Sequence, residues 1–327
     1  PFGNTRMTKV AVTDFTFPNL DLESAILEPL GCQLAAGQCK DAASLIELTA
    51  DADHVITQFA PLDAEVIAAM QRVGVIVRYG IGVDNVDLDA ARTRGIPVCN
   101  VPDYCIEEVS DQTLAFILGC TRQLSANHRK VVTGDWGLGA PLEQMRSLCD
   151  LAVGVVGFGR IGRAVTRRLV AFGCRVQVFD PVVESSDIES LGAVASDWDT
   201  LLQSSDVLTL HCPSTDQTRG IINRETLNRM PAGAILINVA RGDLVDTTAL
   251  VAALQNGHLS GAALDVFDPE PLPADHPLTQ LENVLLSSHI ASASVKAARK
   301  LRETVAGIVA ARVRGERLPN IVNGVDA

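Results

Sequence analysis

The most constraining feature of this 327-residue chain is a glycine-rich turn between a predicted strand and a predicted helix. The apolar run Leu151–Val156 leads directly into Gly157-Phe158-Gly159-Arg160-Ile161-Gly162, and apolar residues at helical spacing predict a helix over Arg160–Phe172. In such a unit the first glycine permits the tight turn, the second lets the backbone approach a pyrophosphate, and the third lets helix and strand pack closely. The pyrophosphate then sits at the helix N-terminus, where N–H groups favour an anion. We therefore expect a dinucleotide to bind at Gly157, Gly159, Arg160, Ile161 and Gly162.

The residue that closes the next predicted strand narrows the choice of dinucleotide. The strand Arg175–Asp180 ends in an acid roughly 20 residues after the glycines, where a carboxylate accepts hydrogen bonds from the ribose hydroxyls of adenosine. The same carboxylate would repel a 2′-phosphate, and Pro181–Asp187 supplies no Arg or Lys to bind one. The sequence therefore predicts NAD rather than NADP as the cofactor.

Predicted strands and helices alternate along the whole chain, which is typical of parallel sheets covered by helices on both faces. Before the glycine motif, strands are predicted at Val10–Phe15, Asp53–Thr57, Val73–Val77 and Ile96–Val101, and helices at Leu62–Met70 and Leu88–Arg94. From the motif onward, strands are predicted at Leu151–Val156, Arg175–Asp180, Asp206–His211, Ala234–Val239, Gly261–Val266 and Asn283–Ser288. Between the two series lies a helical stretch from Ile106 to Val132, and a helix over Ser294–Arg314 follows the second. The fold class is therefore α/β.

Composition argues against several functional classes. The chain has 27 basic and 39 acidic residues, for a net charge of −12, whereas nucleic acids and anionic lipids attract clustered Lys and Arg. No apolar run reaches the roughly 20 residues of a membrane-spanning helix, and no secretory signal is recognised. The eight cysteines include no C-x-x-C pair, which indicates reduced intracellular thiols rather than disulfides or a metal site. We expect a cytoplasmic protein without nucleic-acid, membrane or metal partners.

Three polar residues that follow predicted strands are candidates for a single site. Arg241 follows the strand Ala234–Val239, Glu270 follows the strand Gly261–Val266, and His289 follows the last strand. Because α/β sheets bind ligands beyond the carboxyl ends of their strands, these side chains can converge although they are distant in sequence. Taken singly, each has an ordinary alternative role as a solvated or hydrogen-bonded surface residue.

The segments around these residues resemble the D-isomer-specific 2-hydroxyacid dehydrogenase family. The resemblance rests on the glycine motif together with Asn238-Val239-Ala240-Arg241-Gly242, Asp265-Val266-Phe267-Asp268-Pro269-Glu270-Pro271, Ser287-Ser288-His289-Ile290-Ala291 and Arg78-Tyr79-Gly80-Ile81-Gly82-Val83-Asp84-Asn85-Val86-Asp87. It runs from about residue 50 to residue 295. It implies hydride transfer between NAD(H) and a small D-2-hydroxy acid or 2-keto acid.

The resemblance also implies a domain organisation. Two doubly wound parallel-sheet domains are expected, with a Rossmann NAD-binding domain over residues 104–292 inserted into a flavodoxin-like substrate domain. The substrate domain comprises residues 1–103 and a C-terminal helix within 293–327. The chain crossings near Pro102 and Ala293 would form a hinge, and the active site would lie in the cleft between the domains.

Catalytic roles follow from the resemblance and agree with the chemistry of the reaction. His289 would act as general base toward the substrate hydroxyl, and as the acid in the reverse direction. Glu270 would hydrogen-bond the far imidazole nitrogen and orient the ring. Arg241 would bind the substrate carboxylate through its guanidinium fork, and backbone N–H groups of Tyr79, Gly80 and Ile81 would bind the same carboxylate.

Further cofactor contacts are implied at the carboxyl ends of the strands. The resemblance assigns them to Cys212, Pro213, Thr218, Val239, Ala240, Arg241, Asp265 and His289. Among these, Asp265 is expected to meet the carboxamide of the nicotinamide. His211 precedes this set in the strand Asp206–His211 but receives no chemical role.

The sequence disfavours some candidate substrates but does not select one. Phosphoglycerate is disfavoured because Thr57–Leu62 supplies no cation for a phosphate, and because the chain ends at Ala327 without a C-terminal regulatory domain. Formate is disfavoured because formate dehydrogenases of this superfamily carry Gln in place of Glu270. Substrates of the glycerate, hydroxypyruvate, glyoxylate or lactate type remain open.

Two further alternatives concern assembly and function class. The stretch from Ile106 to Leu148 resembles the dimerisation arm of the family, and its apolar residues Phe116, Ile117, Leu118, Trp136, Leu138 and Leu142 predict a homodimer. The alternative is that these residues pack within their own domain. The competing function class is an NAD(H)-regulated corepressor or scaffold that resembles the C-terminal-binding proteins.

Overall fold

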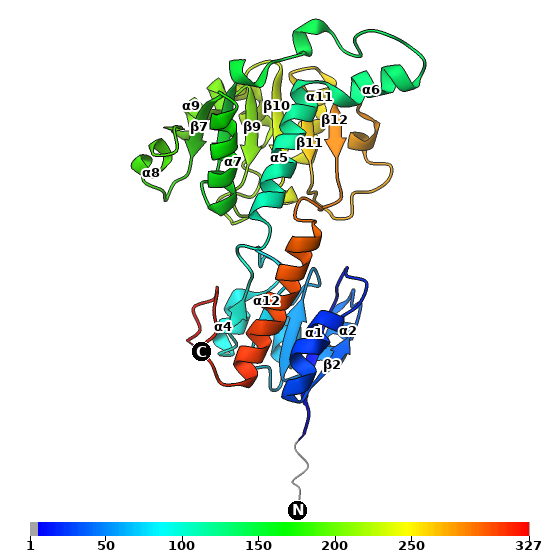
Figure 1. Cartoon of the computed structure of the whole chain (residues 1–327), viewed down its shortest axis with the longest axis vertical. Helices are drawn as coiled ribbons and strands as arrows, with labels where there is room; N and C mark the ends of the chain where they lie inside the picture. Colours follow the sequence, from blue (N-terminus) through cyan, green and yellow to red (C-terminus); the bar gives the residue numbers. More distant parts are fainter. Residues whose placement is uncertain (1–5, 327) are drawn as a thin grey trace, which may run out of the picture. The chain divides into compact units, whose positions relative to one another are not determined.

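The computed structural model describes residues 6–326 and divides into two compact units. Unit 1 consists of Pro1–Tyr104 and Ser294–Ala327, and unit 2 of Cys105–Ala293 (Figure 1). Each division lies one residue from the boundary expected from the sequence. Among residues 6–326, no helix is both long and apolar enough to cross a membrane.

Unit 1 is built on a five-stranded parallel sheet. Its strands are β1 (Thr8–Val12), β2 (Cys32–Ala36), β3 (His54–Thr57), β4 (Ile76–Arg78) and β5 (Val98–Cys99), in the spatial order β2-β1-β3-β4-β5. Its α-helices are α1 (Asp21–Leu27), α2 (Ala42–Thr49), α3 (Ala64–Ala69), α4 (Leu88–Thr93) and α12 (Val295–Val313). This strand order is the flavodoxin-like one and confirms the expected fold of this unit. The strand β2 was not predicted, because CQLAA contains no β-branched or aromatic residue.

Unit 2 is built on a seven-stranded parallel sheet. Its strands are β6 (Ala152–Val156), β7 (Arg175–Phe179), β8 (Val194–Ala195), β9 (Val207–Leu210), β10 (Ala234–Asn238), β11 (Leu259–Leu264) and β12 (Val284–Leu286), in the order β12-β11-β10-β9-β6-β7-β8. Its α-helices are α5 (Ile106–Thr121), α6 (Leu124–Val132), α7 (Arg160–Ala171), α8 (Ser185–Glu189), α9 (Trp198–Ser204), α10 (Arg224–Arg229) and α11 (Thr247–Gln255). Counted from β6, the order is that of the Rossmann fold with one added strand, which confirms the second expectation.

Four strands are read easily from the sequence because they are buried on both faces. Every residue of β3, β6, β9 and β10 is buried. Helices cover the two faces, with α5 and α7 packed side by side on one face of the unit 2 sheet (Figure 1). Burial on both faces selects unbroken apolar runs rather than alternation.

Aspartates set the starts of many helices. The N-cap residues Asp41, Asp63, Asp87, Asp197 and Asp246 each accept a hydrogen bond from the N–H three residues further on. Ser294 caps α12 in the same way, through the N–H of Ala297. Caps of this type are worth about 1 kcal/mol each, so these helix starts are local properties of the sequence.

The single helix predicted from Ile106 to Val132 is wrong, because the chain forms two helices there. Gln123 has a left-handed backbone, with φ of 51°, between the end of α5 and the start of α6. Apolar periodicity continues through this residue, and a periodic pattern does not reveal one left-handed conformation.

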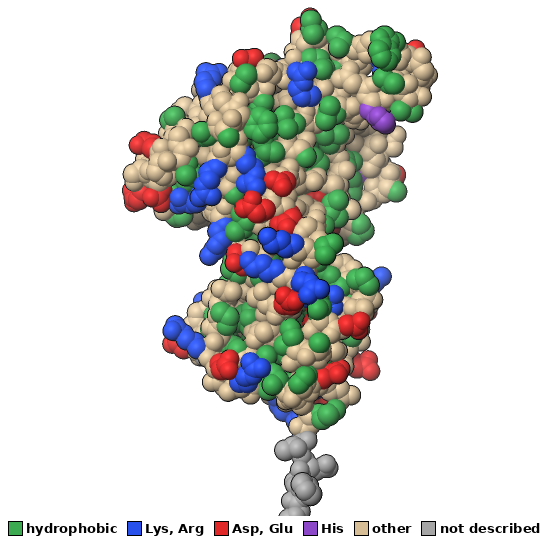
Figure 2. All heavy atoms as spheres, viewed as in Figure 1, with side chains coloured by type: hydrophobic (Ala, Val, Ile, Leu, Met, Phe, Trp, Pro, Cys, Tyr) green, Lys and Arg blue, Asp and Glu red, His purple; other side chains and the backbone are tan. Residues whose placement is uncertain are grey.

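The break divides the residues predicted to form the dimerisation arm. Phe116 and Ile117 are buried in α5, so these two belong to the core of unit 2. The large hydrophobic side chains exposed on α6 and the loop after it are Leu124, Val131, Val132, Trp136, Leu138 and Leu142. Figure 2 shows large apolar side chains on the outside of this projecting segment.

Candidate active site

The glycine motif forms an open cradle at the N-terminus of α7. Gly157 has φ of 93°, and a Cβ added there would lie 2.7 Å from the backbone nitrogen of Cys212. A Cβ on Gly162 would lie 2.1 Å from the carbonyl oxygen of Gly157. Gly159, by contrast, faces open space, with nothing within 4 Å of an added Cβ. Two glycines therefore permit the tight turn, while the third leaves the helix N-terminus accessible, and this cradle fits a pyrophosphate.

Asp180 is held directly beside this cradle. It follows β7, and its two carboxylate oxygens accept hydrogen bonds from the N–H of Phe158 at 2.7 Å and from the N–H of Val182 at 3.0 Å. The first bond ties the carboxylate to the glycine turn itself. The structure therefore places an acid where the ribose next to the pyrophosphate would lie.

The other predicted cofactor segment follows β9, the strand next to β6 in the sheet. Cys212 is buried, and its backbone passes close to Gly157. Thr218 folds the segment after it into a compact turn, because its hydroxyl donates to the carbonyl of Pro213 at 2.6 Å and accepts from the N–H of Thr215 at 2.8 Å. Burial lowers the pKa of His211 to about 3, so this ring is neutral and suits a structural role.

His289 and Glu270 form a hydrogen-bonded pair. His289 lies beyond the end of β12, and its Nδ1 is 2.8 Å from Oε2 of Glu270, which follows β11. The other carboxylate oxygen, Oε1, accepts from the N–H of Phe267 at 2.9 Å. Burial acts to raise the pKa of Glu270, but the hydrogen bonds from His289 and Phe267 and the charges of His289 and Arg241 outweigh it and lower the pKa. Glu270 is therefore an ionised acceptor that fixes the imidazole.

Arg241 lies in the loop beyond β10, the strand next to β11. Its Nη1 donates to the carbonyl of Ala240 at 2.7 Å. The following residue, Gly242, brings this loop against the Glu270 loop, because a Cβ there would lie 2.0 Å from the carbonyl of Phe267. The structure thus brings Arg241, Glu270 and His289 to the carboxyl ends of three adjacent strands. Gly242 had no assigned role, although a glycine directly after a candidate arginine is a signal for such close packing.

Asp265, the predicted nicotinamide contact, is only 1% exposed. Its carboxylate accepts hydrogen bonds from three donors in the segment that contains His289. These three donors all come from the chain itself. The nicotinamide contact stays a prediction. The neighbouring candidates Val239 and Ala240 lie in the Arg241 loop.

The backbone of the predicted substrate loop of unit 1 has hydrogen-bond partners within the chain. The N–H of Tyr79 donates to the carbonyl of Thr57 at 2.8 Å, and the N–H of Gly80 donates to the carbonyl of Arg78 at 2.9 Å. The first bond extends the pairing of β3 with β4 and the second closes a tight turn, so the carboxylate contacts of Tyr79 and Gly80 stay predictions. The Tyr79 side chain is buried and its hydroxyl donates to Glu23 at 2.9 Å. For Ile81 the carboxylate contact stays a prediction.

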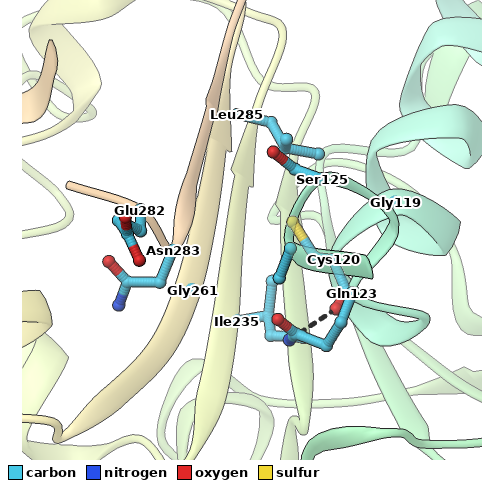
Figure 3. A pocket seen from close by; sticks show the side chains of 10 residues that line it. Gly119, Cys120, Gln123, Ser125, Ile235, Gly261, Glu282, Asn283 and Leu285 are labelled. Atoms are coloured by element: carbon cyan, nitrogen blue, oxygen red, sulfur yellow. Dashed lines mark hydrogen bonds between the residues drawn. The ribbon is translucent and has the colours of Figure 1, made fainter. Parts of the chain in front are cut away.

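A hollow at the opposite end of the unit 2 sheet has a different character. Figure 3 shows it near the amino ends of the strands, where Ile235, Gly261 and Asn283 face Cys120 and Gln123. Its cavity volume of about 20 Å³ is room for a single water molecule. Within residues 6–326, no cluster of His, Cys, Asp or Glu is arranged to hold a metal ion.

Comparison with known proteins agrees with this architecture. Residues 114–291 match the family model described as "D-isomer specific 2-hydroxyacid dehydrogenase, NAD binding domain". The chain is 38% identical over 282 residues to the glyoxylate reductase of Korarchaeum cryptofilum (strain OPF8), which covers 85% of this chain and 85% of that protein. It is 36% identical over 284 residues to the D-3-phosphoglycerate dehydrogenase of Mycobacterium leprae (strain TN), covering 86% of this chain but 53% of that protein.

A solved structure extends the comparison to three dimensions. The crystal structure of D-lactate dehydrogenase from Aquifex aeolicus, complexed with NAD and lactic acid, has a TM-score of 0.84 to this chain at 31% identity, and the match covers 94% of this chain and 96% of that one. The glycine cradle, the strand orders of both sheets and these similarities lead to one conclusion. The chain belongs to the D-isomer specific 2-hydroxyacid dehydrogenase family and is an NAD-dependent oxidoreductase.

Proposed function

We propose that this protein interconverts a small 2-keto acid and the corresponding D-2-hydroxy acid, with glyoxylate and hydroxypyruvate as the first substrates to test. The observation that carries the proposal is the His289–Glu270 pair, hydrogen-bonded at 2.8 Å, with Arg241 in the adjacent loop. An imidazole held by a carboxylate is suited to move a proton, and a guanidinium is suited to bind a carboxylate.

Each residue of this set has a distinct task. Bound NADH would supply the hydride that reduces the keto carbon. With Nδ1 held by Glu270, Nε2 of His289 is the atom assigned to donate the proton to the keto oxygen, and to remove it from the hydroxyl in the reverse direction. Arg241 would bind the substrate carboxylate and polarise the carbonyl beside it. Ionised Glu270 would stabilise the imidazolium form that donates the proton.

The cofactor preference follows from Asp180. Its carboxylate is fixed at the glycine turn by the N–H groups of Phe158 and Val182, so it would meet a 2′-phosphate as a like charge. We expect NADH to be used in preference to NADPH, and the substitution Asp180→Ala to relax that preference. A wild-type protein that prefers NADPH would show this assignment to be wrong.

A substrate panel with both cofactors tests the proposal. Oxidation of NADH and NADPH would be followed by absorbance with glyoxylate, hydroxypyruvate, pyruvate and phosphohydroxypyruvate. Steady turnover on a small unphosphorylated acid is the expected result, and the relatives named glyoxylate reductase and D-lactate dehydrogenase support it. Tight NADH binding without turnover on any acid would overturn it and favour the scaffold alternative. Preference for phosphohydroxypyruvate would overturn the substrate assignment alone.

We also propose that the protein is a homodimer. The exposed apolar side chains of α6 and the following loop, which include Val132 at 69% and Trp136 at 91% exposure, form a patch that a second copy would cover. Light scattering should give the mass of a dimer, and a Val132→Glu, Trp136→Ala double variant should shift it toward the monomer. A monomeric wild type would disprove the assignment.

The cysteines support placing the protein in the cytoplasm. None of the eight, all of which lie within residues 6–326, forms a disulfide bond. Burial raises the pKa values of Cys99 and Cys120 to about 12, so these thiols stay protonated and unreactive. Free, buried thiols are typical of proteins from a reducing compartment.

A further inference from the structure

Two buried polar side chains lie directly beneath the catalytic loops and have no catalytic role of their own. Asn238 is the last residue of β10 and Asp265 follows the last residue of β11, and each is only 1% exposed. Burying a polar group without partners destabilises the fold, and more strongly when the group is charged. The hydrogen-bond partners of Asp265 and Asn238 therefore indicate the function of each residue.

Asp265 is bonded to the segment that carries His289. One carboxylate oxygen accepts from the Ser287 hydroxyl and from the N–H of Ile290 at 2.9 Å, and the other accepts from the N–H of Ala291 at 2.8 Å. The carbonyl of Asp265 accepts the N–H of His289 itself at 2.7 Å. Asp265 therefore holds the loop on both sides of the imidazole.

The backbone of His289 shows why such a restraint is needed. Its φ is 55°, in the left-handed region that non-glycine residues rarely adopt. This conformation is strained for a residue with a side chain, and it persists only when its surroundings determine it. The four hydrogen bonds to Asp265 supply that determination and direct the ring toward Glu270.

Asn238 plays the equivalent part for the Arg241 loop. Its Nδ2 donates to the carbonyl of Arg241 at 2.7 Å, and its Oδ1 accepts from the N–H of Ala240 at 3.0 Å. The side chain thus closes the short loop that carries the guanidinium. The N–H of Asp265 donates to the carbonyl of Asn238 at 2.9 Å, so the two anchors are joined through the backbone of adjacent strands.

We propose that Asp265 and Asn238 are separate positioning residues, Asp265 for the proton-transferring His289 and Asn238 for the carboxylate-binding Arg241. The inference rests on the proposed function. It assigns the chemical step to Asp265 and substrate binding to Asn238. Disturbing Asp265 should slow the chemical step, and disturbing Asn238 should weaken substrate binding, whereas two purely structural residues would affect both quantities alike.

Two near-isosteric substitutions test the division. Asp265→Asn places an NH₂ group against one of the N–H donors, and we expect kcat to fall about 10–100-fold with KM for the keto acid within about twofold of wild type. Asn238→Asp removes the donor to the Arg241 carbonyl, and we expect KM to rise by about 10-fold or more with a smaller change in kcat. The solvent isotope effect on kcat should increase only in Asp265→Asn, because proton transfer then limits the rate.

Milder and control variants keep the test decisive if a substitution impairs folding. Ser287→Ala removes one donor to Asp265 and should lower kcat by a few-fold in the same direction. Asn238→Ala removes both side-chain hydrogen bonds and should again raise KM. The matched control is Asp206→Asn, because Asp206 also receives a backbone hydrogen bond, from Ala152 at 2.8 Å, but precedes β9 at the opposite end of the sheet. It should lower the thermal midpoint without changing either kinetic parameter.

Cofactor affinity and a measurement without turnover distinguish the remaining outcomes. NADH affinity, measured by fluorescence, should fall less in Asp265→Asn than kcat measured at saturating NADH. A loss of NADH affinity with kcat at saturating NADH unchanged would assign Asp265 to the nicotinamide alone and overturn its positioning role. Kinetic changes that do not separate kcat from KM would overturn the division.

The imidazole can also be observed directly by NMR of the NADH complex. The Nδ1–H signal of the His289–Glu270 hydrogen bond should be lost or shifted in Asp265→Asn and kept in Asn238→Asp. Retention of an unshifted signal in Asp265→Asn would overturn the role of Asp265. Because this signal requires no turnover, it is informative even if the wild type reduces none of the acids, a result that would refute the proposed function by itself.

Discussion

Each unit contains a carboxylate paired with a basic side chain from a distant segment, and the two pairs differ in exposure. In unit 1, the Glu23 side chain is fully buried and that of Arg302 is 10% exposed. In unit 2, the side chains of Glu270 and His289 are 33% and 30% exposed. A guanidinium keeps its proton at ordinary pH, whereas an imidazole exchanges one near neutrality. The pair in unit 1 is therefore sealed within the fold, whereas the pair in unit 2 is partly exposed, as the proposed proton transfer requires.

The pair in unit 1 is part of a closed network between the helices α1 and α12. Arg302 donates to Glu23 through Nε at 2.9 Å and through Nη2 at 2.6 Å, and Tyr79 donates to the same carboxylate. The guanidinium also lies 5.0 Å from the ring centroid of Phe17. The hydrogen bond to Glu23 raises the pKa of Arg302, and burial raises that of Tyr79, so both stay protonated donors. Because Glu23 and Arg302 are buried, we assign their charges to the stability of the fold.

The largest expected effect comes from removing the imidazole of the exposed pair. His289→Ala should lower kcat about 10²–10⁴-fold, because general acid–base catalysis contributes that much. NADH affinity and thermal stability should change little, since the side chain is partly exposed. Stopped-flow reduction of the preferred keto acid and NADH fluorescence would measure both. The exposed His128 of α6 provides the control, through His128→Ala. Turnover retained in His289→Ala would show that His289 does not transfer the proton. The two pairs would then not differ in function.

The next largest effect should come from breaking the buried pair. Arg302→Ala leaves Glu23 as an uncompensated buried charge, and we expect the free energy of unfolding to fall by about 3–5 kcal/mol. Urea unfolding followed by circular dichroism would measure it. The double variant Glu23→Leu, Arg302→Met should lose less, because no charge is left buried. A loss below about 1 kcal/mol for the single variant, as for a surface ion pair, would contradict this description.

A third test concerns the buried His54 of unit 1 and asks whether its protonation is coupled to unfolding. His54 is buried in β3, where desolvation lowers its pKa to about 4, although the charge of Asp53 acts to raise it. The unfolded chain binds this proton near pH 6.5, so between about pH 6.5 and 4 the unfolded state holds more protons and stability falls as pH falls. From pH 7.5 to pH 5 the contribution is about 2 kcal/mol. Urea unfolding at both pH values should show this loss in wild type.

The two variants for this test replace one buried and one exposed histidine by glutamine. His54→Gln should remove about 2 kcal/mol of the pH-dependent loss and leave the part due to the buried His211, whereas His128→Gln, at an exposed position, should leave the whole loss intact. An equal pH dependence in all three proteins would show that His54 does not couple folding to protonation. The difference between the units would then rest on Arg302 and His289 alone.

The sequence predicted the fold and most of the candidate site because their signals are local. The run Leu151–Val156 and the glycines after it lie within one strand–turn–helix unit, and Arg241, Glu270 and His289 each follow a strand that was recognised. The spatial meeting of these three could be expected from the rule that carboxyl ends of parallel strands share one edge.

What was missed depended on partners outside the local window. The partners of Tyr79 could not be seen in the sequence, because its N–H bonds the carbonyl of Thr57 in β3 and its hydroxyl bonds Glu23 in α1. The single helix through Gln123 failed because a periodic pattern does not register one left-handed residue. Asp265 was assigned to the cofactor alone, since only the folded loop shows its donors.

By itself, the amino-acid sequence determined the two series of strands and the dinucleotide cradle, because each arises from contacts among neighbouring residues. The tertiary structure alone decided which charges are sealed and which are exposed. Glu23 and Arg302 are 279 positions apart, and nothing in either local segment shows that they meet. Burial and hydrogen-bond satisfaction are properties of the assembled segments, and they determine whether a carboxylate stabilises the fold or serves proton transfer.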